Sequence, residues 1–170
     1  MIRASTRADH DLVDALFETF DLASAPSYGM MLRAHAGALL PIEDWLASGG
    51  IALWEPRGQS LKADLTALGL PVPKTEPLLW ARDEAAYWGT AYVLEGSRLG
   101  GAMIARRLQP GLPCAYLGRV HAPGHWRAFL AALDEGAIAG GAQWQADAVA
   151  AAQRTFDAFA RSARSEADNR

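Results

Sequence analysis

Histidines are the residues of this chain best suited to chemistry, and one of the four has a carboxylate placed to support it. His10 stands at the edge of the apolar stripe of an expected N-terminal helix, and Asp14 follows one helical turn later. An aspartate at i+4 can accept the ring N–H and fix the tautomer, as the hydrogen-bonded partner of a metal-bound histidine does. Pairs of this kind also occur as ordinary contacts on helix surfaces. The pair alone therefore leaves both interpretations open.

The other three histidines have no spacing typical of a metal site. No HExxH pattern is present, and no other close ligand spacing joins them. His35 lies along apolar residues and is interpreted as a hydrogen-bonded core residue, whereas His121 and His125 flank Pro123 as loop and first-turn residues. The single cysteine, Cys114, excludes both a disulfide within the chain and a multi-cysteine metal site.

The segment YVLEGSRLGGAMIARR, residues 92–107, has a helical pattern yet contains three glycines. Each glycine inside a helix costs about 1 kcal/mol relative to alanine. Gly96 and Gly100 are four residues apart and share a helix face, with Gly101 beside them. Such a bare face suits close packing of another helix or contact with a flat ligand, and the residues alone favour packing. A transmembrane helix pair is excluded by the charges of the segment: Glu95, Arg98, Arg106 and Arg107.

A haem would use both features. One histidine cannot hold a bare metal ion, but it can hold the iron of a haem because the porphyrin supplies four of the ligands. A haem would then lie between the helix that carries His10 and the helix that offers the bare glycine face.

Apolar residues recur at helical spacing, and no segment alternates convincingly with period two, so the sequence predicts an all-α fold. Six helices are expected. The first begins at Ser5 and the fifth at Pro123. The other four cover, in order, about Pro26 to Gly49, Ser60 to Gly69, about Asp83 to Leu108, and about Ala142 to Ala163. We expect a single domain over residues 1–170, with residues 164–170 as a frayed tail.

Composition narrows the functional class. The chain carries 16 basic and 19 acidic residues for a net charge of -3, which argues against nucleic acid as a partner. No apolar run approaches the roughly 20 residues of a membrane span, and the charged N-terminus does not resemble a signal peptide. We therefore expect a cytoplasmic protein without a membrane partner.

Five segments, in order, resemble the haem oxygenases: STRADHDLVD, ALLPIEDWL, LKADLTALG, YVLEGSRLGG and AAQRTFDAFA. The similarity is greatest to the short bacterial branch whose distal helix reads EGS-x-LG, and Thr6 and His10 supply a matching T-x-x-x-H stretch. The resemblance implies a helical fold with haem between the first helix and a glycine-kinked distal helix. It implies His10 as the iron ligand, supported by Asp14.

The resemblance also assigns roles around the haem. Gly96, Gly100 and Gly101 would contact its distal face, while Arg3 and Arg127 would hold the propionates. Ser97 stands where mammalian members carry an aspartate that organises water. The candidates for proton delivery are therefore Ser97, Arg98 and ordered water.

The activity implied is the opening of haem to biliverdin with release of carbon monoxide and ferrous iron. Haem would be cofactor and substrate, dioxygen a second substrate, and an external donor such as a ferredoxin the source of electrons. A phytochrome would be an acceptor of biliverdin. Two alternatives remain open: a haem carrier or sensor on the same fold without oxygenase activity, and a helical interaction protein that binds no haem.

Overall fold

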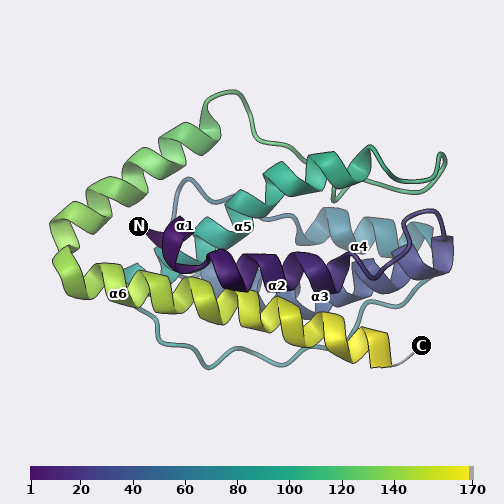
Figure 1. Ribbon diagram of the computed structural model, residues 1–170, viewed down its shortest axis with the longest axis horizontal. Coiled ribbons are helices and arrows are strands. Elements are labelled where there is room, and N and C mark those ends of the chain that lie inside the picture. Colours follow the sequence, from purple (N-terminus) through teal and green to yellow (C-terminus); the bar gives the residue numbers. More distant parts are fainter. Residues whose placement is uncertain (169–170) are drawn as a thin grey trace.

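The computed structural model describes residues 1–168, in which helices are the regular secondary structure and no strand is present. The helices are α1 (Ile2–Ser5), α2 (Arg7–Phe17), α3 (Ala25–Leu46), α4 (Gly58–Ala67), α5 (Glu84–Ala105) and α6 (His125–Asp168). This arrangement confirms the all-α prediction (Figure 1). Within residues 1–168, no helix combines the length and apolar character that crossing a membrane requires.

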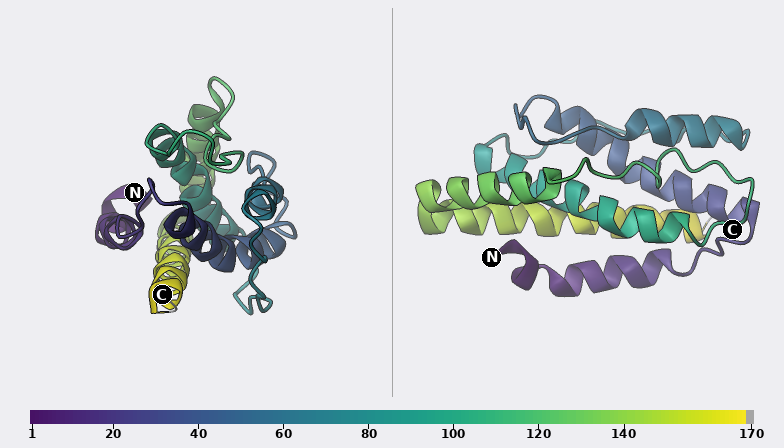
Figure 2. Two further views of the ribbon diagram at one scale, coloured as in Figure 1. Left: turned by 90° about the vertical axis from the view of Figure 1, so that its right-hand side faces the viewer. Right: turned by 90° about the horizontal axis from the view of Figure 1, so that it is seen from above.

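Helix α6 is the element around which the others pack. It contacts α1, α2, α3 and α5, while α4 packs against α3 (Figures 1 and 2). The core lies between these helices and is formed by apolar side chains that are fully or almost fully buried, among them Tyr28, Leu32, Leu39, Leu61, Leu94 and Phe129. The two helices relevant to the site, α2 and α5, are thus held through their contacts with α6.

Helix α6 bends sharply at Gly141, where φ is 72° and ψ is -163° (Figure 1). This backbone conformation is accessible essentially to glycine alone. The bend coincides with the predicted boundary between the fifth and sixth helices. Of the residues predicted as a frayed tail, 164–168 continue α6, whereas 169 and 170 lie outside the described residues.

The N-terminal helix is divided where the sequence predicted one helix from Ser5. Thr6 separates α1 from α2, and its side-chain hydroxyl donates a hydrogen bond of 3.0 Å to the carbonyl of Ile2. Thr6 is the N-cap residue of α2. Its carbonyl accepts the backbone N–H of His10 at 3.0 Å, so this threonine begins the helix that carries the histidine.

Helices α3 and α5 begin near the predicted starts, Pro26 and Asp83, and each has a side-chain cap. The Ser24 side chain accepts the N–H of Ser27, and the Asp83 carboxylate accepts the N–H of Ala86 at 2.8 Å. Such caps satisfy N–H groups that have no partner within the helix. Helix α5 continues through all three glycines of the segment, so the expected kink does not interrupt it.

Candidate functional site

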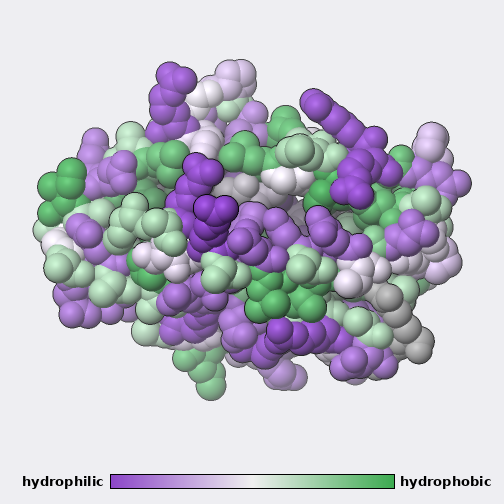
Figure 3. Space-filling model, viewed as in Figure 1, coloured by the Kyte–Doolittle hydropathy of each residue, from purple (hydrophilic) through white to green (hydrophobic). Residues whose placement is uncertain are grey.

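A cavity of about 340 Å³ lies between the N-terminal helices, α5 and α6. Its lining comes from four elements and the residue between α1 and α2: Arg3, Thr6, Arg7, His10, Asp11, Tyr92 and Phe156. This volume falls at the small end of the range of about 300–1,000 Å³ for ligand pockets. In the space-filling view, the surface between α2 and α5 is hollowed and bordered by hydrophilic side chains (Figure 3).

His10 lines this cavity and has the carboxylate partner that the sequence predicted. Its Nδ1 lies 3.2 Å from Oδ2 of Asp14, and its ring meets that of Phe156 edge-on at 5.9 Å between centroids. Burial raises the pKa of Asp14, and His10 opposes that effect. The contact at Nδ1 leaves Nε2 as the ring nitrogen available to a ligand.

The basic residues of the cavity differ in part from the predicted pair. Arg3 lines the cavity as expected, and Arg7 lines it as well, although the sequence analysis did not single Arg7 out. Arg7 has only a loose contact of 3.9 Å with Asp11. Arg127 is exposed and does not line the cavity. Arg7 follows Arg3 by four residues, about one helical turn. This spacing could have indicated that both arginines lie at the cavity.

The three glycines of α5 have different surroundings. Within the described residues, a Cβ placed at Gly100 would have no atom within 4 Å, and one at Gly96 would meet only the Trp126 ring at 3.6 Å. A Cβ at Gly101 would lie 3.3 Å from the carbonyl oxygen of Leu117. Close approach of the segment between α5 and α6 therefore accounts for Gly101 but not for Gly100.

The open glycines continue a helix stripe that begins in the cavity. Tyr92, Gly96 and Gly100 are spaced by four residues and so lie on one face of α5. Tyr92 lines the cavity. The bare backbone of α5 thus extends from the cavity that also contains His10.

Ser97 is occupied by contacts away from this stripe. Its hydroxyl donates to the carbonyl of Leu94 at 2.7 Å and accepts a hydrogen bond of 2.6 Å from Nη2 of Arg57. Arg57 also donates to the Leu94 carbonyl at 3.0 Å and is itself almost fully buried. Arg57 was missed by sequence reasoning because it is forty residues away from Ser97.

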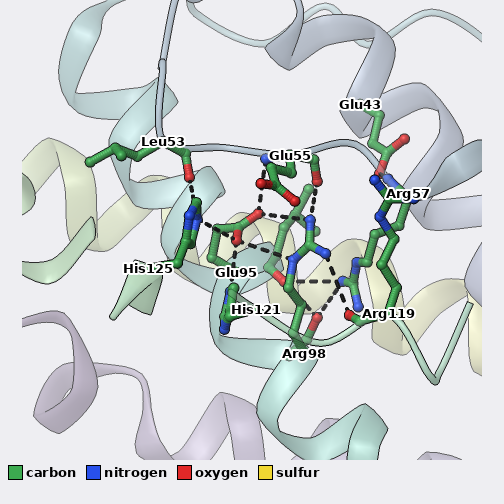
Figure 4. Close-up of polar contacts among 11 residues, drawn as sticks. Glu43, Leu53, Glu55, Arg57, Glu95, Arg98, Arg119, His121 and His125 are labelled. Carbon is green, nitrogen blue, oxygen red and sulfur yellow. Dashed lines mark hydrogen bonds and ion pairs between the residues drawn. The ribbon is translucent and has the colours of Figure 1, made fainter. Parts of the chain in front are cut away.

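Arg98 is buried beside Glu95 (Figure 4). It is not among the residues that line the cavity. Its Nε lies 3.1 Å from Oε2 of Glu95, and its Nη2 donates to the carbonyl of Glu55. Both side chains are at most 1% exposed. These contacts place the guanidinium against a buried carboxylate, and the expected role of Arg98 in proton delivery stays a prediction.

Two histidines meet the same carboxylate. Nε2 of His121 lies 2.8 Å from Oε2 of Glu95, and Nε2 of His125 lies 3.4 Å from it (Figure 4). Burial lowers the pKa of His121, against the raising effect of Glu95. These three side chains have no close spacing along the sequence. Glu95 is distant from the two histidines in the chain, and folding brings it next to them.

His35 is a core residue, as interpreted from the sequence. Its Nδ1 lies 3.0 Å from the hydroxyl of Tyr116, and its ring packs against Phe17 and Phe159. Burial lowers the pKa of His35 to about 3, so the ring is neutral near pH 7.

Comparison with known proteins shows a similar sequence in a bacterial protein. The chain is 40% identical over 147 residues to a protein of Xanthomonas campestris pv. campestris (strain 8004) named heme oxygenase. The match covers 79% of this chain and 87% of that protein. No protein-family model matches the chain.

Proposed function

This chain belongs to the haem oxygenase family, and from that premise we propose that it binds haem in the cavity described above with His10 on the iron. It is an oxidoreductase that degrades haem, so haem is its substrate and an electron donor its partner. When bound, haem supplies the chemistry, a reaction with dioxygen that opens the ring to biliverdin and releases carbon monoxide and ferrous iron.

The observation that carries this proposal is the composition of the cavity wall. His10 stands on one side, and Tyr92, the first residue of the stripe that continues to Gly96 and Gly100, stands on another. The space at Gly100 is open within the described residues, as a flat ligand lying against bare backbone requires. The chain thus offers one imidazole and one side-chain-free helix face to the same ligand.

The residues on the His10 side bind and orient the ligand. Asp14 holds the proton on Nδ1 of His10, 3.2 Å away, and so directs Nε2 to the iron. Arg3 and Arg7 supply two cations at the cavity, suited to the two propionates because guanidinium groups pair with carboxylates through two hydrogen bonds. We assign the propionates to this pair in preference to Arg127.

On the glycine side, α5 presents backbone without side chains at Gly96 and Gly100. Hydrogen bonds hold the neighbouring part of α5 in place. Arg57 ties the Ser97 hydroxyl to the backbone of α5. Both Ser97 and Arg98 have their polar atoms engaged elsewhere, so ordered water along the stripe is the proton source that agrees best with these contacts. We assign a positioning role to Ser97 and Arg98 and direct ligand contact to Gly96 and Gly100.

Finer features of the family assignment are also part of this proposal. The segment EGSRLG at residues 95–100 supports membership of the short bacterial branch. We propose one domain over residues 1–170, a ferredoxin as electron donor and a phytochrome as an acceptor of biliverdin.

The test is an absorption time course of the haemin-loaded protein in air with ascorbate and catalase. We expect the Soret band to fall while biliverdin absorption grows.

His10→Ala should fold yet show no histidine-ligated haem spectrum. Added imidazole should restore that spectrum by entering the space that the missing side chain leaves. An unchanged ferric spectrum in His10→Ala would overturn the assignment. A stable wild-type spectrum without turnover would favour the haem carrier or sensor.

Arginine variants separate the two assignments for the propionates. Arg3→Ala and Arg7→Ala should each weaken haem affinity, whereas Arg127→Ala, outside the cavity, is the matched control. A weakening in Arg127→Ala alone would show that the propionates point towards α6 instead.

A further inference from the structure

Glu95, His121 and His125 form a cluster of three metal-ligating side chains outside the haem cavity (Figure 4). Glu95 comes from α5, His121 from the segment before α6, and His125 from the first residue of α6. One ligand atom of each lies within 4.8 Å of the other two. The three side chains are between 1% and 14% exposed, so the cluster is largely shielded from water.

We propose that Glu95, His121 and His125 form a second metal site, which binds one divalent ion of the zinc or ferrous iron type independently of His10. Zinc binds imidazole nitrogen and carboxylate oxygen at about 2.0–2.2 Å, so two ligands of a tetrahedral site lie about 3.3 Å apart. The two Nε2 atoms lie 2.8 and 3.4 Å from Oε2 of Glu95. These two distances are within about half an ångström of that ligand spacing.

The choice of metal follows from the ligand types. Two imidazoles and one carboxylate suit zinc, ferrous iron and related transition metals, whereas calcium and magnesium prefer oxygen ligands throughout. A set of three protein ligands leaves a fourth position for water. We therefore expect Zn²⁺ and Co²⁺ to bind and Mg²⁺ to compete poorly.

The carboxylate of Glu95 is oriented as metal-bound carboxylates usually are. Its Oε1 accepts the N–H of Glu55 at 3.2 Å and a hydrogen bond of 3.3 Å from Nη2 of Arg98. These partners fix the carboxylate while Oε2 faces both imidazoles. Hydrogen-bond partners of this kind orient ligands and sustain metal affinity.

Two groups compete with the ion. Arg98 already neutralises Glu95, which reduces the attraction for a second cation. Nε2 of His125 lies 2.8 Å from the carbonyl of Leu53 and must give up this contact on binding metal. Nδ1 of His121 is buried with no hydrogen-bond partner among the described residues, and an ion bound at Nε2 would leave this atom unchanged.

A metal here would tie the segment before α6 to the glycine helix. Glu95 directly precedes Gly96, and His121 stacks on Trp126, the ring that lies beside Gly96. Binding should therefore stabilise the packing of Trp126 beside Gly96 without occupying the haem cavity.

The test is calorimetric titration of Zn²⁺ into the full-length chain, first freed of metal with a chelator, with and without haem. We expect one Zn²⁺ per chain, and His121→Ala and His125→Ala should each weaken binding by on the order of tenfold or more. His10→Ala, which removes the exposed histidine next to Asp11 and Asp14, is the matched control and should bind zinc as the wild type does.

A Co²⁺ titration of the haem-free wild type provides a measurement that needs no variant. We expect intense visible absorption bands of a four-coordinate ion, displaced by Zn²⁺ but not by excess Mg²⁺. Absence of stoichiometric binding would overturn the proposal and leave the cluster as a hydrogen-bonded contact. Zinc binding that survives both histidine variants, or that is lost in His10→Ala, would overturn it too.

Discussion

At the scale of single residues, Gly100 and Gly101 stand side by side in α5 yet meet different surroundings. The position of Gly100 is open, whereas that of Gly101 is buried against Leu117. Adjacent residues of one glycine-rich stretch thus serve two purposes. Gly101 allows a close approach of the chain, and Gly100 leaves the open space in which we propose that the ligand binds.

Gly100→Leu should separate folding from function. Leucine favours a helix over glycine by up to about 1 kcal/mol, so the haem-free variant should be slightly more stable than the wild type. Its haem uptake or turnover should fall because the side chain fills the open face. Urea unfolding and haemin titration measure the two effects. Gly101→Leu should instead lower the free energy of unfolding, and normal turnover in Gly100→Leu would contradict the ligand role of this glycine.

His35 predicts a pH dependence of stability. Its pKa is about 3 in the folded protein against 6.5 for the free side chain, so only the unfolded chain takes up the proton between these values. The stabilising contribution is therefore complete above pH 6.5 and is lost as the pH falls towards 3, by about 1.4 kcal/mol per pH unit. Urea unfolding at pH 7, 6 and 5 measures this. His35→Gln should have a shallower slope, and equal slopes would disprove this origin.

At the scale of elements, the bend of α6 determines where its two halves lie. The part before Gly141 carries Trp126 towards Gly96, and the part after it carries Phe156 to the His10 cavity. The backbone conformation of Gly141 therefore determines how α6 contributes to both the glycine side and the His10 side of the site. Periodicity predicted two helices here, and the boundary residue proved to be the bend.

Gly141→Ala should destabilise the protein by about 1–3 kcal/mol, because φ of 72° with ψ of -163° is strained for any residue with a Cβ. Gly100→Ala is the matched control, since it adds the same methyl group at a helical, open position and should be neutral or stabilising. Equilibrium unfolding in urea compares the two. Equal stabilities would show that the bend relaxes freely.

At the scale of the whole molecule, haem is expected to join helices that otherwise meet mainly through α6. Binding at a hundred times the dissociation constant stabilises a folded protein by about 2.7 kcal/mol. For a chain of this size, haemin should then raise the melting temperature by about 5–10 °C. His10→Ala should show a smaller rise at the same haemin concentration. A chelator in both samples removes any contribution from the Glu95 cluster, and equal rises would argue against iron ligation by His10.

Local sequence determined much of the helical framework of this protein. Ser24 and Asp83 mark helix starts through caps that involve only near neighbours, and the spacing of His10 and Asp14 suffices to bring them together on one turn. The stripe of Gly96 and Gly100 follows from helical periodicity in the same way. Such features depend on contacts within one or two turns, so the order of residues is enough to predict them.

Tertiary structure decided what surrounds these features. Arg57 reaches Ser97, and Glu95 meets His121 and His125, across separations of 26 to 40 residues. These contacts depend on the course of the loops and on the bend of α6, which no local periodicity encodes. The same packing left Gly100 open, closed Gly101 against Leu117 and placed Arg7 rather than Arg127 at the cavity. The sequence by itself thus determined which groups each helix presents, and the packing of the helices decided which of them share a site.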